Sequence, residues 1–445
     1  MQLNQLSFNF SQTGSRISQK VNIDKGTLAW GARAAEHQAK HPETINATIG
    51  TVKSDEGKLL ISRTVQKEIC SLSPDEMFGY GSIKGLPAFV EGWKVDTLNM
   101  YPEDLQDHVS QNTSEPLPVA GGLTTGLYVV GQTILDAGDV LVTPDARWGN
   151  VDNIFAGNLG LKIEDFSFFD ENNTFNLAGL RQAIQDARKT GKRVVLYLNF
   201  PNNPTGYMMS LAEAKNLGKF LESQTEELIV ILDDAYEGYV YQNDFSDDLK
   251  PINFSIFPYI FDRSENVIVF KVDAPTKRRS MYGFRLGVIS FGPVLLSMRK
   301  LDLRHLLAKT ARTIFSSAPR PPQEALAKIF ADPDKYKAMK AEMSEIVAIL
   351  DQRHRIMLEK EHSMPALNAL KPMPANSGFF HLYDLKGMDA HLFGEKLLEN
   401  GLGVVPITNQ SGLNVIRIAH SGIPTNKVDL AVEILWNTAL EVISE

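Results

Sequence analysis

The sequence has few of the features that mark secreted, membrane-spanning or nucleic-acid-binding proteins. Its one cysteine, Cys70, cannot form an internal disulfide, which suits a reducing compartment. No apolar run is long enough to span a bilayer, and the first residues lack the basic-then-apolar pattern of a secretory signal. The 45 basic and 53 acidic residues give a net charge of -8, without the excess of cations that nucleic acids attract. We therefore predict a cytoplasmic protein that binds neither membranes nor nucleic acids.

Several common catalytic motifs are missing as well. The nine histidines show no metal-ligand spacing, so no metal site is predicted. The chain has no Walker A phosphate loop and no GxSxG nucleophile elbow. The stretch GYGSIKG at 79–85 nearly matches the dinucleotide fingerprint, but its last glycine comes one residue late and no clear strand precedes it. These absences direct attention to the ends of the predicted strands.

Strand and helix patterns alternate along most of the chain. With 445 residues, the chain is too long for one ordinary domain. Between about 75 and 320, short apolar runs such as DVLVTP and ELIVILD alternate with amphipathic segments, which predicts an α/β domain with a mostly parallel sheet and helices on both faces. A long helical stretch and the strands around GFFHLYDL and LNVIRIA then indicate a smaller α+β domain. We expect an N-terminal arm with part of the small domain at 1–74, a large domain at 75–335 and the rest of the small domain at 336–445.

Charged residues follow two of the predicted strands, where ligands of an open parallel sheet bind. One strand ends in LDDAYEGY, and a buried carboxylate there needs a partner such as a protonated ring nitrogen. Another precedes APTKRRSMYGFRLG, whose cations could hold a phosphate and whose Lys277 could act as a nucleophilic amine. A helix cap for the acids and a solvated basic loop for the cations are the alternatives.

Three further stretches complete a possible site. In AGGLTTGL, glycines lead into a helix whose first N–H groups could bind phosphate, unless this is an ordinary capped helix start. In PDARWGN, Trp148 could stack on a planar ring or lie in the core. The loop NFPNNPTGY has more turn residues than a connection needs. A phosphate cradle, a reactive lysine, a carboxylate and a stacking aromatic together describe a site for pyridoxal phosphate.

From about Asn46 to Arg417, these ordered motifs resemble the fold type I, class I aminotransferases of the aspartate and aromatic amino acid group. NNPTG matches the family's hallmark, and the resemblance implies that Asn203 binds the cofactor's ring oxygen, whereas Asn199 and Asn202 are turn residues. DDAY implies Asp233 on the pyridine nitrogen and Tyr236 on the ring hydroxyl.

The resemblance also implies the residues that hold the cofactor's aldehyde and phosphate. Lys277 matches the Schiff-base lysine. The phosphate would be bound by Arg285, by the turn residues Gly122, Leu123 and Thr124, and by Tyr80 from the other subunit. Trp148 would stack on the ring. The match at Tyr80 implies a homodimer with shared active sites.

For the substrate, the resemblance implies that Arg417 clamps the α-carboxylate, with Gly50, Trp148 and Asn203 close by. Arg312 in ARTIFSSAP matches an arginine that binds a side-chain carboxylate across the dimer, although an ordinary helix-surface arginine is the alternative. The implied reaction moves an amino group between an L-amino acid, dicarboxylic or aromatic, and a 2-oxo acid such as 2-oxoglutarate. Lys277 with Asp233 and Tyr236 would be the catalytic residues.

Two departures and two alternatives accompany the resemblance. Ala274 stands where the family usually has a phosphate-binding serine, and we expect Arg278 or Arg279 to offset the lost donor. The segment 242–259 also departs from the family and could reshape the entrance. Lyases and decarboxylases that use the same cofactor share every motif quoted. A regulator that binds a ligand without turnover is a further interpretation, disfavoured by the intact Lys277.

Overall fold

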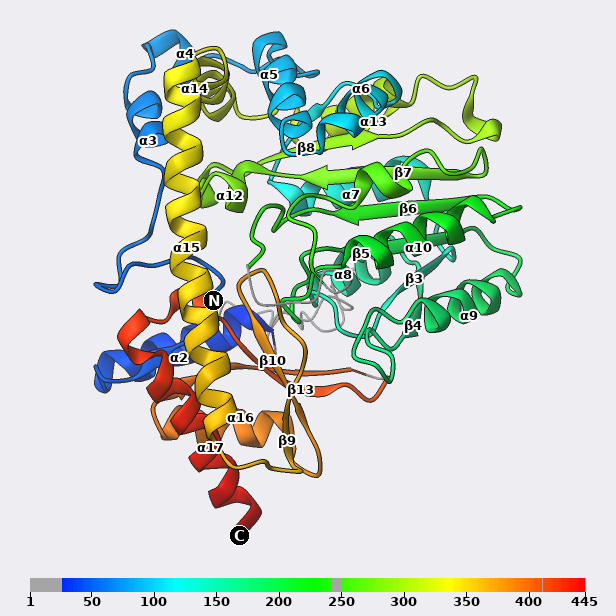
Figure 1. The fold of residues 1–445 in the computed structure, drawn as a ribbon. Helices are drawn as coiled ribbons and strands as arrows, with labels where there is room; N and C mark the ends of the chain where they lie inside the picture. Colours follow the sequence, from blue (N-terminus) through cyan, green and yellow to red (C-terminus); the bar gives the residue numbers. More distant parts are fainter. Residues whose placement is uncertain (1–25, 242–249, 410, 445) are drawn as a thin grey trace, which may run out of the picture.

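A seven-stranded sheet forms the centre of the larger part of the molecule in the computed structural model, which describes residues 26–241, 250–409 and 411–444 (Figure 1). Strands β3 to β7 pair in parallel, and only β8 runs against its neighbours. The predicted mostly parallel sheet is confirmed. In spatial order the strands are β2 (Leu117–Ala120), β8 (Leu286–Phe291), β7 (Val267–Asp273), β6 (Leu228–Asp233), β5 (Val194–Asn199), β3 (Val140–Pro144) and β4 (Lys162–Phe166).

Helices cover both faces of this sheet, as its sequence pattern predicts. Successive residues of a strand face opposite sides, so in β5 Val195 and Tyr197 enter one core while Leu196 and Leu198 enter the other. Because neither face of the central strands meets water, β3, β5 and β6 are mostly apolar, whereas the edge strand β4 is partly exposed and carries charged residues. One face is covered by α7 (Leu123–Ile134) and α13 (Leu303–Phe315), and the other by α9 (Leu177–Arg188), α10 (Leu211–Glu222) and α11 (Phe257–Ile260).

Further helices and short turns surround the large sheet. Trp93 lies in a core that α3, α5 and α14 form beside β8. The helices are α3 (Arg63–Cys70), α4 (Pro74–Phe78), α5 (Pro87–Leu98), α6 (Glu103–Asn112), α8 (Asn150–Asp152), α12 (Pro275–Arg278) and α14 (Arg320–Phe330), with the turns η1 (Asn153–Asn158), η2 (Tyr282–Phe284) and η3 (Leu296–Met298). Among the described residues, we find no helix long and apolar enough to cross a membrane.

A second, smaller core lies at the other end of the molecule, as predicted (Figure 1). Its antiparallel sheet has the order β12 (Val405–Thr408), β13 (Asn414–Ile418), β10 (His381–Leu385) and β9 (Leu370–Pro372), and β1 (Ile45–Asn46) pairs with β11 (Leu402–Gly403). Its helices and turns are α2 (Thr27–Lys40), α16 (Ala390–Glu399), α17 (Val428–Ser444), η4 (His420–Gly422) and η5 (Thr425–Lys427).

The long helix α15 (Pro333–Ser363) joins the two parts (Figure 1). Ile346 and Leu350 pack into a core of the large sheet, whereas Met357 packs into the smaller core. The predicted domain boundary falls in the first turn of α15, and it stays a prediction because the helix belongs to both cores. Residues 1–25 of the predicted arm and residues 242–249 of the predicted insertion lie outside the described residues.

The loop after β5 also connects the two parts. Its Gly206 has a φ of +72°, and its carbonyl accepts hydrogen bonds from the N–H groups of Asn376 and Ser377, at 2.8 and 2.9 Å. A Cβ on Gly206 would overlap with the carbonyl oxygen of Phe380. Glycine is therefore needed here for its backbone conformation and for the close approach of a second backbone.

We expect Gly206→Ala to destabilise the fold by about 1–2 kcal/mol for the left-handed backbone and by a further 1–3 kcal/mol or so for overpacking. Gly191→Ala is the matched control, because Gly191 has a φ of +67° and no atom within 4 Å of a Cβ placed there. Urea unfolding of both variants measures the difference. Equal losses of unfolding free energy would show that the backbone contact at Gly206 is unimportant.

Candidate active site

A cavity of about 210 Å³ lies at the carboxyl ends of β5 and β6, beside the N-terminus of α7. Open parallel sheets bind ligands at this edge. Segments far apart in the sequence meet here because parallel strands all end on the same side. The predicted residues that line the cavity are Leu123, Thr124, Trp148, Asn203, Asp233, Tyr236, Lys277 and Arg285.

Lys277 lies on α12, the single helical turn that follows β7. Its Nζ atom is 4.5 Å from the centre of the Tyr236 ring, and the hydroxyl of Tyr239 donates to the Lys277 carbonyl at 2.7 Å. Burial lowers the pKa of Lys277 from 10.5 to about 8, because the charged amine loses water, although nearby Asp233 opposes the change. A larger fraction of this amine is neutral near pH 8 than for an exposed lysine.

Asp233 ends β6 with a carboxylate that is only 2% exposed. The hydroxyl of Tyr197 donates to it at 2.7 Å and the N–H of Ala235 at 3.0 Å. Burial raises the pKa of Asp233 because these neutral donors replace only part of its hydration. Tyr197 was not predicted as a site residue. It lies two residues before Asn199 on the same strand, so the two side chains point to the same face, and this spacing could have indicated it.

The loop after β5 is held by its asparagines. Asn199 donates to the Asp233 carbonyl at 2.9 Å and accepts from the N–H of Asn203 at 2.8 Å. Asn202 accepts from the N–H of Thr205 at 3.0 Å, as a turn residue does. Asn199 does more than the turn role that we predicted for it, because it joins the backbone of Asp233 to that of Asn203.

Arg417 is a buried cation beside the cavity, with 3% exposure. Its guanidinium donates to the Asn203 side-chain oxygen at 3.1 Å and to the Thr48 carbonyl at 2.7 Å, and it lies 4.3 Å from the centre of the Phe380 ring. A Cβ on Gly50 would approach that ring to 2.7 Å. Burial lowers the pKa of Arg417 to about 10. Among the described residues Arg417 forms no ion pair and its Nε has no partner, which suits an anionic ligand.

The N-terminus of α7 and Arg285 form the other end of the cavity. The N–H groups of Leu123 and Thr124 lie in the first turn of α7 and have no partner within the helix. The N–H of Gly122 instead donates to the Arg285 carbonyl at 2.8 Å, so it is not free for the phosphate contact that we predicted. Because Gly122 has no side chain, space remains beside the Arg285 guanidinium, from which a Cβ would lie only 2.8 Å away. The buried hydroxyl of Thr276, beside the cavity, also has no partner.

The expectation that Arg278 or Arg279 replaces a phosphate donor lost at Ala274 is wrong. Both guanidinium groups bind Asp96, at 2.9 and 2.6 Å, and Arg278 also binds Glu237 at 3.1 Å. These acids lie behind the cavity. The sequence could not indicate this arrangement because Asp96 is 182 residues away from Arg278.

Tyr80 and Arg312, which were predicted to act from the other subunit, do not line the cavity of their own chain. Tyr80 is 93% exposed. Arg312 is exposed on α13, where its guanidinium contacts the hydroxyl of Ser316. Both were expected to act across a dimer, and this expectation stays a prediction.

Known proteins resemble the chain over most of its length. The family described as "Aminotransferase class I and II" matches residues 42–435. The chain belongs to the class I and II aminotransferase family. An aspartate aminotransferase from Pyrococcus horikoshii is 24% identical over 349 residues, which is 75% of this chain and 80% of the relative. The crystal structure of an aminotransferase from Anaerococcus prevotii superposes with a TM-score of 0.78 at 21% identity, covering 98% of this chain and 99% of that one.

A third protein with the same fold is the Pyrococcus horikoshii kynurenine aminotransferase, solved in complex with PMP. It has a TM-score of 0.76 at 18% identity and covers 98% of this chain and 99% of its own. The family uses pyridoxal phosphate in its transaminase reaction. The aminotransferase fold expected from the sequence is therefore confirmed.

The cavity of this aminotransferase fits that cofactor. The space beside Gly122, the free N–H groups of α7 and the Arg285 guanidinium suit a phosphate. The buried Asp233 carboxylate, which has only neutral donors, suits a protonated ring nitrogen. The Lys277 amine lies between these two ends of the site in the same cavity.

We expect Lys277→Met to stabilise the cofactor-free protein. A base whose pKa falls from 10.5 to about 8 on folding binds fewer protons in the folded state, so stability rises with pH across that window. The variant lacks this penalty. Its melting temperature should exceed that of the unchanged protein most clearly below pH 8, with the gain shrinking toward pH 10.5. Lys219→Met, on an exposed surface, is the control. A difference that does not vary with pH would contradict this account.

Proposed function

We propose that the protein is a pyridoxal-phosphate-dependent aminotransferase that exchanges an amino group between a dicarboxylic or aromatic L-amino acid and a 2-oxo acid such as 2-oxoglutarate. The observation that carries this proposal is the position of the buried Lys277 amine, 4.5 Å from the Tyr236 ring and in one cavity with Asp233. A buried amine of lowered pKa beside a carboxylate is the arrangement that lysine needs to act as a nucleophile and as a base.

The lining residues have distinct roles in holding the cofactor under this proposal. The N–H groups of Leu123 and Thr124 and the guanidinium of Arg285 bind the phosphate. Asp233 binds the ring nitrogen. The ring oxygen is bound by Asn203 and Tyr236, and Trp148 stacks on the ring. Tyr80 of a second copy completes the phosphate site in a homodimer, which its 93% exposure supports.

When bound, pyridoxal phosphate supplies a ring that accepts electrons from the substrate α-carbon. The protein's part is to place the charges and move the proton. Asp233 keeps a proton on the ring nitrogen through its negative charge. Arg417 binds the substrate α-carboxylate and so orients the α-carbon. Lys277 removes the proton from the α-carbon as a general base and returns a proton later as a general acid.

The substrate class is supported by three features. Arg417 is a buried cation without an ion pair among the described residues, so it suits the α-carboxylate that all amino acids carry. Phe380 places an aromatic ring against this clamp, and Trp148 lines the cavity. Arg312 of a second copy would bind the side-chain carboxylate of a dicarboxylic substrate. The curated relative from Pyrococcus horikoshii is named an aspartate aminotransferase.

We expect the purified protein with pyridoxal phosphate to show a visible absorbance band that glutamate or aspartate bleaches. Lys277→Ala should lose the band and all turnover, because no other amine in the cavity can take its place. Transfer from a panel of amino donors to 2-oxoglutarate then identifies the substrate. A band that leads to release of carbon dioxide or ammonia would favour a decarboxylase or lyase. No band at all would favour a non-catalytic ligand-binding protein.

Arg417→Gln and Arg312→Gln should affect different substrates. Loss of the buried Arg417 charge costs roughly 2–5 kcal/mol of binding, so kcat/KM should fall at least about 30-fold for every donor. Arg312→Gln should lower kcat/KM for aspartate and glutamate and leave aromatic donors within about twofold, since these have no second carboxylate for a charge-assisted bond. Equal losses for both donor classes in Arg312→Gln would exclude the role proposed for Arg312.

A further inference from the structure

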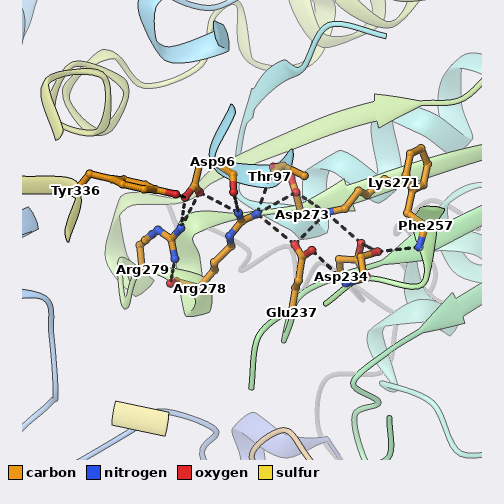
Figure 2. A network of polar contacts seen from close by, with 11 residues as sticks. Asp96, Thr97, Asp234, Glu237, Phe257, Lys271, Asp273, Arg278, Arg279 and Tyr336 are labelled. Atoms are coloured by element: carbon orange, nitrogen blue, oxygen red, sulfur yellow. Dashed lines mark hydrogen bonds and ion pairs between the residues drawn. The ribbon is translucent and has the colours of Figure 1, made fainter. Parts of the chain in front are cut away.

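A network of buried charges joins α5, β7, α12 and the segment after β6 (Figure 2). Each of its seven charged residues is at most 6% exposed. None of them lines the cavity. The acids are Asp96, Asp234, Glu237 and Asp273, and the cations are Lys271, Arg278 and Arg279. So many buried charges are costly unless they are paired, and the pairing restricts their positions closely.

Arg278 joins two parts of this network. Its Nη2 donates to the Asp96 carboxylate at 2.9 Å and to the Asp96 carbonyl at 3.1 Å, while its Nη1 donates to Glu237 at 3.1 Å. The guanidinium also lies 5.0 Å from the centre of the Trp93 ring. One planar group therefore connects α5 to the segment that follows β6 (Figure 2).

Both partners of Arg278 are held from their other sides. Asp96 accepts from Arg279 at 2.6 Å and from the hydroxyl of Tyr336 on α15 at 2.9 Å. Glu237 accepts from Lys271 at 3.1 Å. Arg278 thus lies between Asp96 and Glu237, each of which another hydrogen bond also holds, and it forms a longer ion pair of 3.8 Å with Asp273.

The residues that directly precede Arg278 and Glu237 in the sequence face the cavity. Lys277 precedes Arg278, and Tyr236 precedes Glu237. On the cavity side the Lys277 Nζ lies 4.5 Å from the Tyr236 ring centre, and on the network side Arg278 binds Glu237. The Arg278–Glu237 ion pair and the Lys277–Tyr236 contact therefore connect the same two segments, α12 and the residues that follow β6.

We propose that Arg278 is a positioning residue, which holds Lys277 against Tyr236 by joining Asp96 to Glu237. This inference rests on the function proposed above and adds to it a residue outside the cavity. Lysine cannot replace arginine in this role, because its single ammonium lacks the planar fork that reaches two carboxylates at once. The charge would still be paired with one acid, so the variant keeps a compensated core.

Arg278→Lys and Arg279→Lys form a matched pair of variants. Both remove a buried guanidinium and keep its charge, but Arg279 binds Asp96 and the Arg278 carbonyl, whereas Arg278 reaches Glu237. We expect Arg278→Lys to lower kcat about 10-fold or more, since small displacements of a catalytic group are costly, with KM within about twofold. Arg279 binds the Asp96 carboxylate through a single nitrogen, which an ammonium can replace, so Arg279→Lys should keep kcat and KM within about twofold of the unchanged protein.

A second measurement needs no cofactor. Carbamylation of Lys277 by cyanate, followed by peptide mass spectrometry, reports how much of this amine is neutral at a given pH. If Arg278→Lys lets Lys277 move toward solvent, its pKa rises and the midpoint of its labelling rate plotted against pH shifts upward by about half a pH unit or more. Arg279→Lys should label like the unchanged protein. Glu237→Gln removes the other partner of the Arg278–Glu237 ion pair and should behave like Arg278→Lys. It therefore replaces Arg278→Lys in the test if Arg278→Lys does not fold.

Melting temperatures separate positioning from loss of fold. The inference is overturned if the two lysine variants lose the same activity and label alike, or if the lost activity only follows the unfolded fraction. Absence of a visible band in the unchanged protein would refute the proposed function instead, and the labelling comparison would still test the link between Arg278 and Lys277.

Discussion

The site depends on two charges, Asp233 and Arg417, that are buried at one edge of the large sheet and form no ion pair among the described residues. Asp233 accepts hydrogen bonds only from neutral donors, and Arg417 donates to an amide and a carbonyl. Holding such groups away from water costs free energy, which packing on both faces of the sheet must offset. A ligand that brings a cation to Asp233 and a carboxylate to Arg417 recovers part of that cost as affinity. Because helices cover both faces of the sheet, the cavity at its edge can select ligands by charge.

Each segment that enters the site also has a structural side. The residues at 233, 236 and 277 face the cavity, and those at 234, 237 and 278 belong to the ion network behind it. Neighbouring residues point in different directions along an extended chain or a short turn. One stretch of backbone can thus hold reactive groups on one side and the ion pairs that restrain them on the other.

The parts of the site that were predictable lie within single motifs. The cavity contains Lys277, Asp233 and Asn203 as expected. Each lies at or soon after the end of a strand, and the apolar run of that strand shows in the sequence where the strand ends. The errors concern contacts between motifs. Arg278 was expected at a phosphate but binds Asp96, since a basic cluster alone does not reveal its acid. Tyr197 was missed because an aromatic residue in a buried strand normally indicates core.

The sequence by itself determined most strands, the division into a larger and a smaller part, and the types of residue at the strand ends, because periodicity and motif spacing are local properties of the chain. Only the tertiary structure decided which of these groups are paired and which stay uncompensated. That outcome depends on residues from distant segments, such as Arg279 after α12 and Tyr336 on α15, which meet Asp96 on α5 only when the chain is packed. Burial then sets the pKa of Lys277, since desolvation is a property of the packed core rather than of any motif.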